Sequence, residues 1–485
     1  MLFNSYIFIF AFFPLCLLGF YTLKKNHQTA VKIWLIGCSL WFYGYFNTKY
    51  LLIMIASILF NYMIFKLMLK NRWKKGWFIC GIVGNLSVLF YFKYYDFFIE
   101  NINHIFSTSL ALKHILLPLG ISFFTFQQIS FLTDTYRNEI QNCSFVNYAL
   151  FVSFFPQLIA GPIVTQDEML PQFENIGRKI EAEEFAKGLS LFVLGLCKKV
   201  LIADTFGLAV DKGYGMIGEL NSIDALLVML FYTLQLYYDF SGYCDMAVGL
   251  GEMLGIQIPL NFKSPYKAPN IIDFWKRWHI TLSRFFMKNI YIPLGGNRKG
   301  VARTYCNLLM VFFISGLWHG AGWNFVLWGM MHGILYCITR WVQKNRGGKK
   351  HFIPKAVGIA GTFLFVNAAW IFFRSPTISD AFALITRIFT GGLAAPSSAN
   401  AECFNLKEFW YLLKVFHLTD FAWSPYIIMT VFTVVILWAT FFTKNVHEIV
   451  ADCKFRMGGA VVLAVLFVWC VVSLSGVSTF LYFNF

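Results

Sequence analysis

Two histidines lie in a stretch without charged side chains, from Tyr305 to Thr339. They are His319 and His332, and His319 stands in the glycine-rich break Ser-Gly-Leu-Trp-His-Gly-Ala-Gly at residues 315–322. Because the stretch exceeds the roughly 20 residues of one helical span, it predicts two spans, or a span and a re-entrant turn, that meet at the break. A helix from Tyr305 would bring His319 roughly 20 Å into the bilayer. An ionisable group in irregular backbone at that depth predicts a cavity and a functional site. The alternative is a core histidine that bonds between helices.

The second candidate, His279, lies in the segment Asn270–Lys288. Asn270 followed by Asp273 three residues later is a helix start signal. The polar and apolar residues that follow fall on opposite faces, which predicts one amphipathic helix at an interface. His279 lies on the apolar side. We expect this helix to fold inward and bring His279 to the cavity of His319; the alternative places His279 at the lipid headgroup boundary.

Three further groups could support chemistry. The turn Ile292–Gly300 offers free amides, Arg298 and Lys299 to phosphate groups, or it is an ordinary headgroup-contacting loop. Asp239 and Asp245 in an apolar segment could orient a histidine or offset a buried Lys or Arg, and we interpret both as structural pairs. His332 is interpreted as structural.

The elements that must position these residues are membrane helices. The chain is 58% hydrophobic and 13% charged, and its mean hydropathy is +0.61. This composition predicts an all-α, polytopic membrane protein with about 10–12 transmembrane helices plus re-entrant and interfacial helices. The segment Arg374–Ser424, with an amphipathic stretch Ala381–Phe389, is expected on the outer surface. We expect a single domain, residues 1–485. The apolar segments are Leu2–Leu23, Val31–Phe46, Leu51–Leu69, Trp77–Phe92, Ile115–Leu132, Val146–Pro162, Ala186–Leu208, Asp224–Leu254, the run from Tyr305, Ala356–Phe373, Tyr426–Phe442 and Gly458–Leu481.

The net charge of +16 resides in short loops beside apolar segments, so it indicates the positive-inside pattern rather than binding to nucleic acid. The basic segments Lys24–Lys25, Lys70–Lys75, Arg340–Lys355 and Lys444–Arg456 are predicted to be cytoplasmic. Both termini are then extracytoplasmic, and the first segment is a retained anchor. The eleven cysteines show no metal-ligand spacing with histidine, so we expect neither a metal site nor a disulfide framework.

Motifs along nearly the whole chain resemble the membrane-bound O-acyltransferase family, and within it the branch of the membrane subunit of bacterial alginate O-acetylation. The family-motif core covers about residues 115–340. The matching motifs are Met1–Ser5, Leu117–Phe126, Tyr136–Arg137, Phe155–Ile163, Tyr238–Tyr243, Phe274–Ile280, Ile292–Arg298 and Leu317–Gly320.

The resemblance implies a ring of tilted helices around a central funnel, with His319 as the deep catalytic histidine and His279 as the second signature residue. It implies transfer of an acyl group, most simply acetyl from acetyl-CoA, for O-acetylation of an exported or cell-surface polysaccharide. An extracytoplasmic partner acyltransferase and a glycan acceptor are the expected partners, in the bacterial plasma membrane. No bound cofactor is expected.

On this interpretation His319 is the general base, because neutral imidazole can accept the acceptor hydroxyl's proton near pH 7. His279 positions the donor or stabilises developing charge. Arg298, Lys299 and the motif tryptophans Trp275 and Trp318 are donor-binding candidates.

Two other functions stay open from the sequence. D-alanyl transfer to teichoic acid would use a carrier-protein thioester as donor. A proton-coupled transporter or lipid flippase would use the histidine as a proton relay; such proteins show matched broken helices, and no second Trp-His-Gly break is present.

Overall fold

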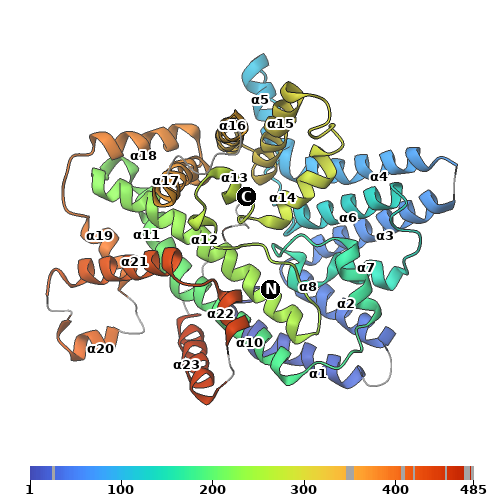
Figure 1. Ribbon diagram of the computed structural model, residues 1–485, viewed down its shortest axis with the longest axis horizontal. Coiled ribbons are helices and arrows are strands. Elements are labelled where there is room, and N and C mark those ends of the chain that lie inside the picture. The colour runs from blue at the N-terminus through green and yellow to red at the C-terminus, as the bar shows by residue number, and fades with distance from the viewer. Residues whose placement is uncertain are drawn as a thin grey trace. The chain divides into compact units, whose positions relative to one another are not determined.

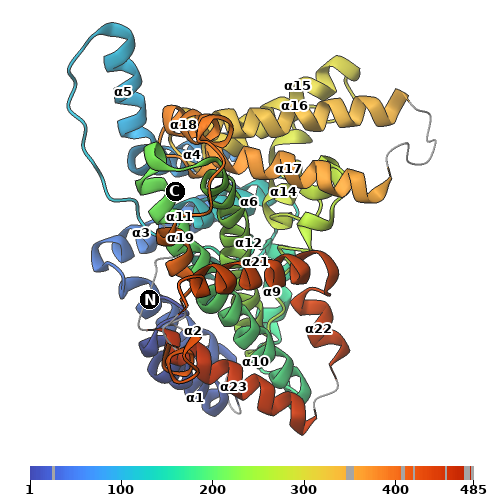
Figure 2. The same ribbon diagram turned by 90° about the vertical axis from the view of Figure 1, so that its left-hand side faces the viewer.

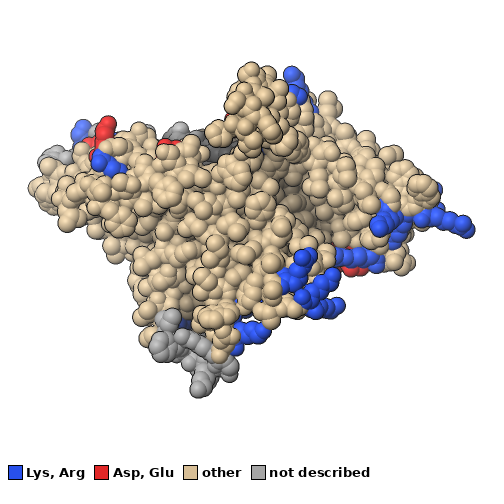
Figure 3. Space-filling model, turned by 90° about the horizontal axis from the view of Figure 1, so that it is seen from above, with Lys and Arg blue, Asp and Glu red and all other residues tan. Residues whose placement is uncertain are grey.

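The computed structural model describes the chain except residues 25–27, 71, 346–353, 406–409, 419–420, 454–455, 475–480 and 482–485. The described residues form helices and loops without a β-strand, which confirms the all-α class. Uncharged side chains cover most of the face shown in Figure 3. Parts of the basic segments expected in the cytoplasm, including Lys25, Asn71 and residues 346–353 and 454–455, lie outside the described residues, as do residues 475–480 of the last expected span.

Seven helical stretches of the described chain are long and apolar enough to cross a membrane, so the protein is a multi-pass membrane protein. Two shorter apolar helical stretches, Phe8–Leu23 and α23 (Met457–Ser473), accompany them. The expected total of 10–12 spans stays a prediction. The seven are α3 (Thr48–Lys70), the continuous run from α4 to α5 (Lys74–Phe106), α12 (Ser222–Met253), α15 (Val301–His319), α16 (Trp323–Asn345), α17 (Lys355–Arg374) and α21 (Ser424–Phe442).

Contacts divide the described chain into two compact units. The first contains residues 1–192, 246–260 and 284–293. Part of its core is a cluster of phenylalanine rings, in which Phe155 lies 5.3 Å from Phe12 and 5.6 Å from Phe42, centroid to centroid. Besides α3, α4 (Lys74–Leu89) and α5 (Tyr95–Phe106), its helices include α1 (Phe13–Leu23), α2 (Gln28–Gly44), α6 (Ile121–Tyr136), α7 (Phe145–Ser153), α8 (Phe155–Leu158) and α9 (Gln166–Glu174).

Two of the expected spans, Val146–Pro162 and Ile115–Leu132, are not continuous helices over the predicted residues. Within Val146–Pro162, α7 ends at Ser153, and nine residues of helix cover only about 14 Å. The chain leaves the helical conformation at Phe154, shortly before Pro156, which has no N–H to continue the helix. Within Ile115–Leu132, helix α6 starts only at Ile121, after Gly120 at φ +68°.

The second unit contains residues 193–245, 261–283 and 294–485 and holds every predicted site residue. Figures 1 and 2 show its helices α15 and α16 running side by side. Gly316 and Gly329 permit this pairing, because a Cβ on Gly316 would lie 3.3 Å from the Cα of Gly329 and closer still to the Phe325 carbonyl. The remaining helices that the text uses are α11 (Asp204–Gly215), α13 (Ile271–Trp275), α14 (Ile280–Phe286), α18 (Ile378–Thr390) and α22 (Val446–Asp452).

The amphipathic stretch expected at Ala381–Phe389 is confirmed as part of α18. Thr377 and Asp380 form a capping box at its start. Arg374, just before it, pairs with Asp211 of α11 at 2.7 Å. Whether α18 lies on the outer surface of the membrane stays a prediction.

Candidate active site

His319 is the last residue of α15, and the backbone at Gly320 is extended before α16 begins at Trp323. Two helices therefore meet at the glycine-rich break, which is the first of the two arrangements predicted for this run. The side chain of His319 is buried, with 3% of its surface exposed. Its depth in the bilayer stays a prediction.

Aromatic rings surround His319. Ring centroids lie 4.8 Å away for Trp318, 5.1 Å for Trp328 of α16 and 5.2 Å for Phe373 of α17. These side chains are themselves buried, so they exclude water from the imidazole. Electrostatic interactions at such a site are stronger than in water.

The segment around His279 is not the single helix that its pattern predicted. The N-cap is confirmed, since the Asn270 side chain accepts from the Asp273 N–H at 3.0 Å. Helix α13 nevertheless ends at Trp275, and α14 begins only at Ile280. The break occurs because backbone groups there bond to residues 261–263: the Lys263 N–H donates to the Arg277 carbonyl, and the Ile280 N–H to the Asn261 carbonyl. These bonds replace the next helical turn.

His279 lies at this break with φ +46°, a left-handed conformation that is uncommon for residues other than glycine. Its side chain has no exposed surface, so a position among lipid headgroups does not fit. The His279 and His319 ring centroids are 6.5 Å apart, and Trp318 lies 6.2 Å from His279. The structure therefore brings the two predicted catalytic histidines together.

Asn261 fixes which nitrogen of His279 carries the proton. The Oδ1 atom of Asn261 accepts from the Thr281 N–H at 3.2 Å, so the amide orientation is set by a donor that cannot reverse. His279 Nδ1 lies 3.1 Å from the same oxygen and must therefore donate to it. Burial lowers the pKa of His279 from 6.5 to about 3. The imidazole is neutral near pH 7, with Nε2 as its unprotonated nitrogen.

Trp275 and His332 form a buried pair beside this site. The Trp275 Nε1–H donates to His332 Nδ1 at 3.3 Å, and both rings contact Trp328, which also contacts His319. This contact agrees with a structural role for His332. Of the tryptophans predicted to bind the donor, Trp318 contacts both histidines, and Trp275 lies one ring further away, behind Trp328.

Arg298 and Lys299 are not beside the histidines. Both are exposed in the turn that precedes α15, whereas His319 ends that helix, about 27 Å away along its axis. The turn is held by Asn307, whose side chain donates to the carbonyl of Gly296 at 3.2 Å. Their role in binding a donor stays a prediction.

The two carboxylates form ion pairs with lysines, as interpreted from the sequence. Asp239 pairs with Lys199 at 2.8 Å, and Asp245 pairs with Lys198 at 2.6 Å. His447 of α22 also contacts Asp245, at 2.9 Å. These groups connect distant parts of the second unit.

Sequence reasoning missed Asn261 and His447. Asn261 precedes His279 by 18 residues and lies in no catalytic pattern, and His447 is 202 residues from Asp245. Only the folded chain brings either residue to its partner.

Comparison with known proteins finds similarity along most of the chain. A model of the membrane-bound O-acyltransferase family matches residues 35–375. The chain is 44% identical over 417 residues to the peptidoglycan O-acetyltransferase of Helicobacter pylori, covering 79% of each protein. It is 37% identical over 409 residues to the probable alginate O-acetylase AlgI of Pseudomonas aeruginosa, covering 82% of this chain and 77% of the relative.

The similarity extends at a lower level to the teichoic acid D-alanyltransferase of Bacillus subtilis, with 25% identity over 314 residues, 61% of this chain and 78% of the relative. The family model covers most of the chain and includes His279 and His319. This chain belongs to the membrane-bound O-acyltransferase family.

Proposed function

We propose that this O-acyltransferase moves acetyl groups from a cytosolic thioester, most simply acetyl-CoA, for O-acetylation of an exported or cell-surface polysaccharide. The observation that carries the proposal is the buried pair of imidazoles, His279 and His319, with ring centroids 6.5 Å apart. Two such groups can act on one reacting centre from which aromatic side chains exclude water.

The reaction needs one proton to move. As the acceptor hydroxyl oxygen attacks the thioester carbonyl, His319 takes the hydroxyl proton. The carbon–sulfur bond then breaks, and the same proton passes to the leaving thiolate, which gives a free thiol and an acetyl ester. Transfer through an acetyl-imidazole on His319 is the alternative route.

The hydrogen bond from His279 to Asn261 narrows the role of His279. Its Nδ1–H is used on Asn261 Oδ1, so the neutral ring presents an acceptor at Nε2. An acceptor cannot stabilise a developing oxyanion. We therefore assign His279 to accepting a hydrogen bond that positions a substrate.

Acetyl transfer is favoured over D-alanyl transfer by the relatives. Two named as O-acetyltransferase or O-acetylase share 44% and 37% identity with this chain, whereas the D-alanyltransferase shares 25%. Membership of an acyltransferase family also weighs against a transporter or flippase. In this proposal an extracytoplasmic acyltransferase passes the acetyl group to the glycan, and the site of action is the bacterial plasma membrane.

The test is the ester content of the exported and cell-wall polysaccharides of a strain that lacks the gene. Complementation with the native chain should restore acetate esters, His319→Ala should not, and His104→Ala, which changes an exposed histidine outside the site, should restore them fully. Mass spectrometry measures the acetate and the D-alanine released from these polymers, which are the products of the two candidate reactions. Loss and recovery of D-alanine with unchanged acetate would overturn the proposal.

A further inference from the structure

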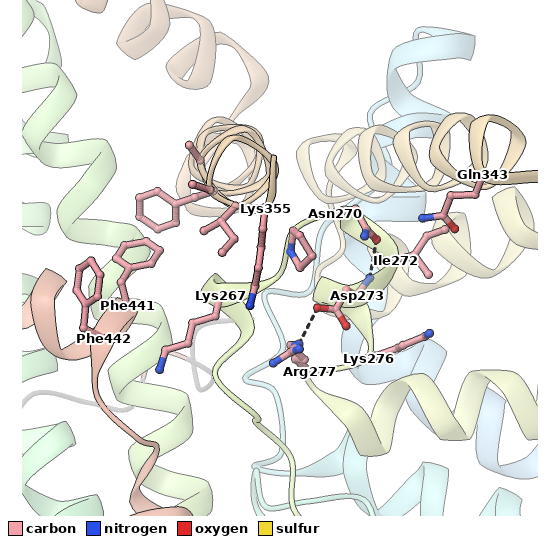
Figure 4. Close-up of a pocket in the computed structure, with 15 residues that line it drawn as sticks. Lys267, Asn270, Ile272, Asp273, Lys276, Arg277, Gln343, Lys355, Phe441 and Phe442 are labelled. Carbon is pink, nitrogen blue, oxygen red and sulfur yellow. Dashed lines mark hydrogen bonds and ion pairs between the residues drawn. The ribbon is translucent and has the colours of Figure 1, made fainter. Parts of the chain in front are cut away.

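A groove of about 830 Å³ lies in the second unit, lined by the start of α13, the end of α16, the start of α17 and the end of α21. Figure 4 shows these elements around it. The groove is about the size of a pocket for a small molecule. None of its lining residues is among the residues assigned above to acyl transfer.

One part of the groove is strongly basic. Its cations are Lys267, Lys276, Arg277 and Lys355, and its carboxylate is Asp273, which pairs with Arg277 at 2.8 Å. Lys267 donates to the carbonyl of Thr443. Among the described residues, no carboxylate lies within ion-pair distance of Lys276 or Lys355. The groove therefore has an excess of positive charge.

Neutral donors add to these cations. Ala356 in the first turn of α17 lines the groove, so the unbonded N–H groups of that helix start contribute partial positive charge. The side chains of Asn270 and Gln343 also line it. Together with the lysines, these groups match the oxygens of a phosphate.

The other part of the groove is apolar and belongs to membrane spans. Ile359 and Phe363 come from α17, and Phe441 and Phe442 from the last turn of α21. Phe442 is 77% exposed. Figure 4 shows Phe441 and Phe442 on the opposite side of Lys267 from Arg277 and Asp273. The basic part lies where one span begins and another ends, which is where a bilayer surface is expected.

We propose that this groove binds an anionic phospholipid, with its phosphate beside Lys355 and Arg277 and its acyl chains along α17 and α21. Basic pockets between membrane helices bind acidic lipid headgroups in this way. A nucleotide-bearing thioester also carries phosphate, but the exposed apolar surface next to the cations matches acyl chains better. The proposal does not depend on which acyl group the enzyme transfers.

The bound lipid would hold a segment that reaches the active site. Asp273, Lys276 and Arg277 line the groove, while Trp275, Trp278 and His279 of the same short segment are buried. A phosphate that ties Arg277 to Lys355 of α17 would therefore fix the position of that segment. The backbone at His279 is left-handed, so its geometry depends on such constraints.

The test is native mass spectrometry of the purified full-length protein with added dioleoylphosphatidylglycerol or dioleoylphosphatidylcholine. The double variant K276Q/K355Q removes two lysines of the groove, neither of which has an ion pair among the described residues. K263Q/K344Q removes two exposed cations from the same parts of the chain that do not line the groove. We expect the phosphatidylglycerol adduct to be retained by the native chain and the control, and to weaken about 30-fold in K276Q/K355Q.

Equal retention of both lipids, or equal loss in the two double variants, would overturn the proposal. A second arm adds coenzyme A. Displacement of the lipid by coenzyme A, with coenzyme A binding weakened by K276Q/K355Q alone, would assign the groove to the acyl donor and also overturn it. Thermal unfolding of each variant checks that the fold is retained.

Discussion

At the scale of single residues, the site depends on one amide. Asn261 Oδ1 accepts from the Thr281 N–H, the Thr281 hydroxyl and His279 Nδ1. These three bonds fix the ring of His279 and its tautomer. Because its Nδ1–H is used on Asn261, the neutral His279 presents a hydrogen-bond acceptor at Nε2 rather than a donor to an oxyanion.

Replacing Asn261 tests the orientation of His279. Asn261→Leu removes the acceptor and should lower kcat for acetyl transfer between about ten- and a hundredfold. Asn261→Asp retains an oxygen for both the Thr281 N–H and His279 Nδ1–H, so it should keep most of the activity. Thermal unfolding of both variants reports on folding, and equal activity in the two would show that Asn261 does not act through His279.

The buried state of His279 predicts a pH dependence of stability. His279 lies in the break between α13 and α14, outside the seven candidate spans, and burial lowers its pKa to about 3. The unfolded chain takes up a proton on this side chain below about pH 6.5, which the folded chain does not. The contribution of neutral, buried His279 to the free energy of unfolding is therefore complete above pH 6.5 and is lost as the pH falls toward 3.

The variant His279→Asn removes this titration, and asparagine tolerates the positive φ. Between pH 7.5 and 5 the native chain should lose up to about 2 kcal/mol more unfolding free energy than His279→Asn. Thermal unfolding in detergent, followed by tryptophan fluorescence, measures the difference. Parallel losses in the two proteins would contradict a neutral, buried His279.

The sequence identified His319 because an ionisable residue in an apolar run is costly and calls for an explanation. It identified His279 from its place on the apolar side of an amphipathic pattern and from the family resemblance. It did not identify Asn261, because a polar residue outside the apolar runs carries no such signal. Nor does it show that Arg298 and Lys299, which precede α15, are separated by the length of that helix from His319 at its end.

At the scale of elements, the break before His279 is the main departure from prediction. The residues 270–288 have a helical pattern of polar and apolar side chains, and their N-cap is where the pattern places it. The bonds that end α13 come from residues 261–263, which no local pattern describes. Periodicity reports which face is buried, and tertiary hydrogen bonds decide where the helix stops.

The pairing of α15 with α16 gives the prediction at this scale. In Gly316→Ala, the added Cβ would clash with the Phe325 carbonyl, so the variant should lose about 1–3 kcal/mol and unfold at a lower temperature. Gly361→Ala in α17 is the matched control, because nothing lies within 4 Å of its Cβ. It should be neutral or slightly stabilising. Equal melting temperatures for the two would contradict the close approach of the helices.

At the scale of the whole molecule, hydropathy predicted the class of the protein and most of its long helices. It did not separate lipid-facing from buried segments: the most apolar window of α12 is 72% buried within the structure. It also took Val146–Pro162 as a span, because apolar composition alone does not register the effect of Pro156. Composition alone predicted that the chain is helical. The positions at which helices break became clear only from the backbone of the folded chain.

The orientation of the chain is a separate prediction. If the basic segments are cytoplasmic, alkaline phosphatase fused after Phe485 should be active, and the same enzyme fused after Asn345 should be inactive. A fusion of green fluorescent protein should give the opposite pattern. Inactive phosphatase after Phe485 would show that the C-terminus is cytoplasmic.

The measurement that tests the central claim most directly is acetyl transfer from radiolabelled acetyl-CoA by proteoliposomes that contain this protein, its partner acyltransferase and an acceptor glycan. The native chain and His104→Ala should transfer acetyl groups at equal rates, and His319→Ala should lose at least about a hundredfold in rate. Transfer at the native rate by folded His319→Ala, or an intact acetyl-CoA pool with the native chain, would contradict the account.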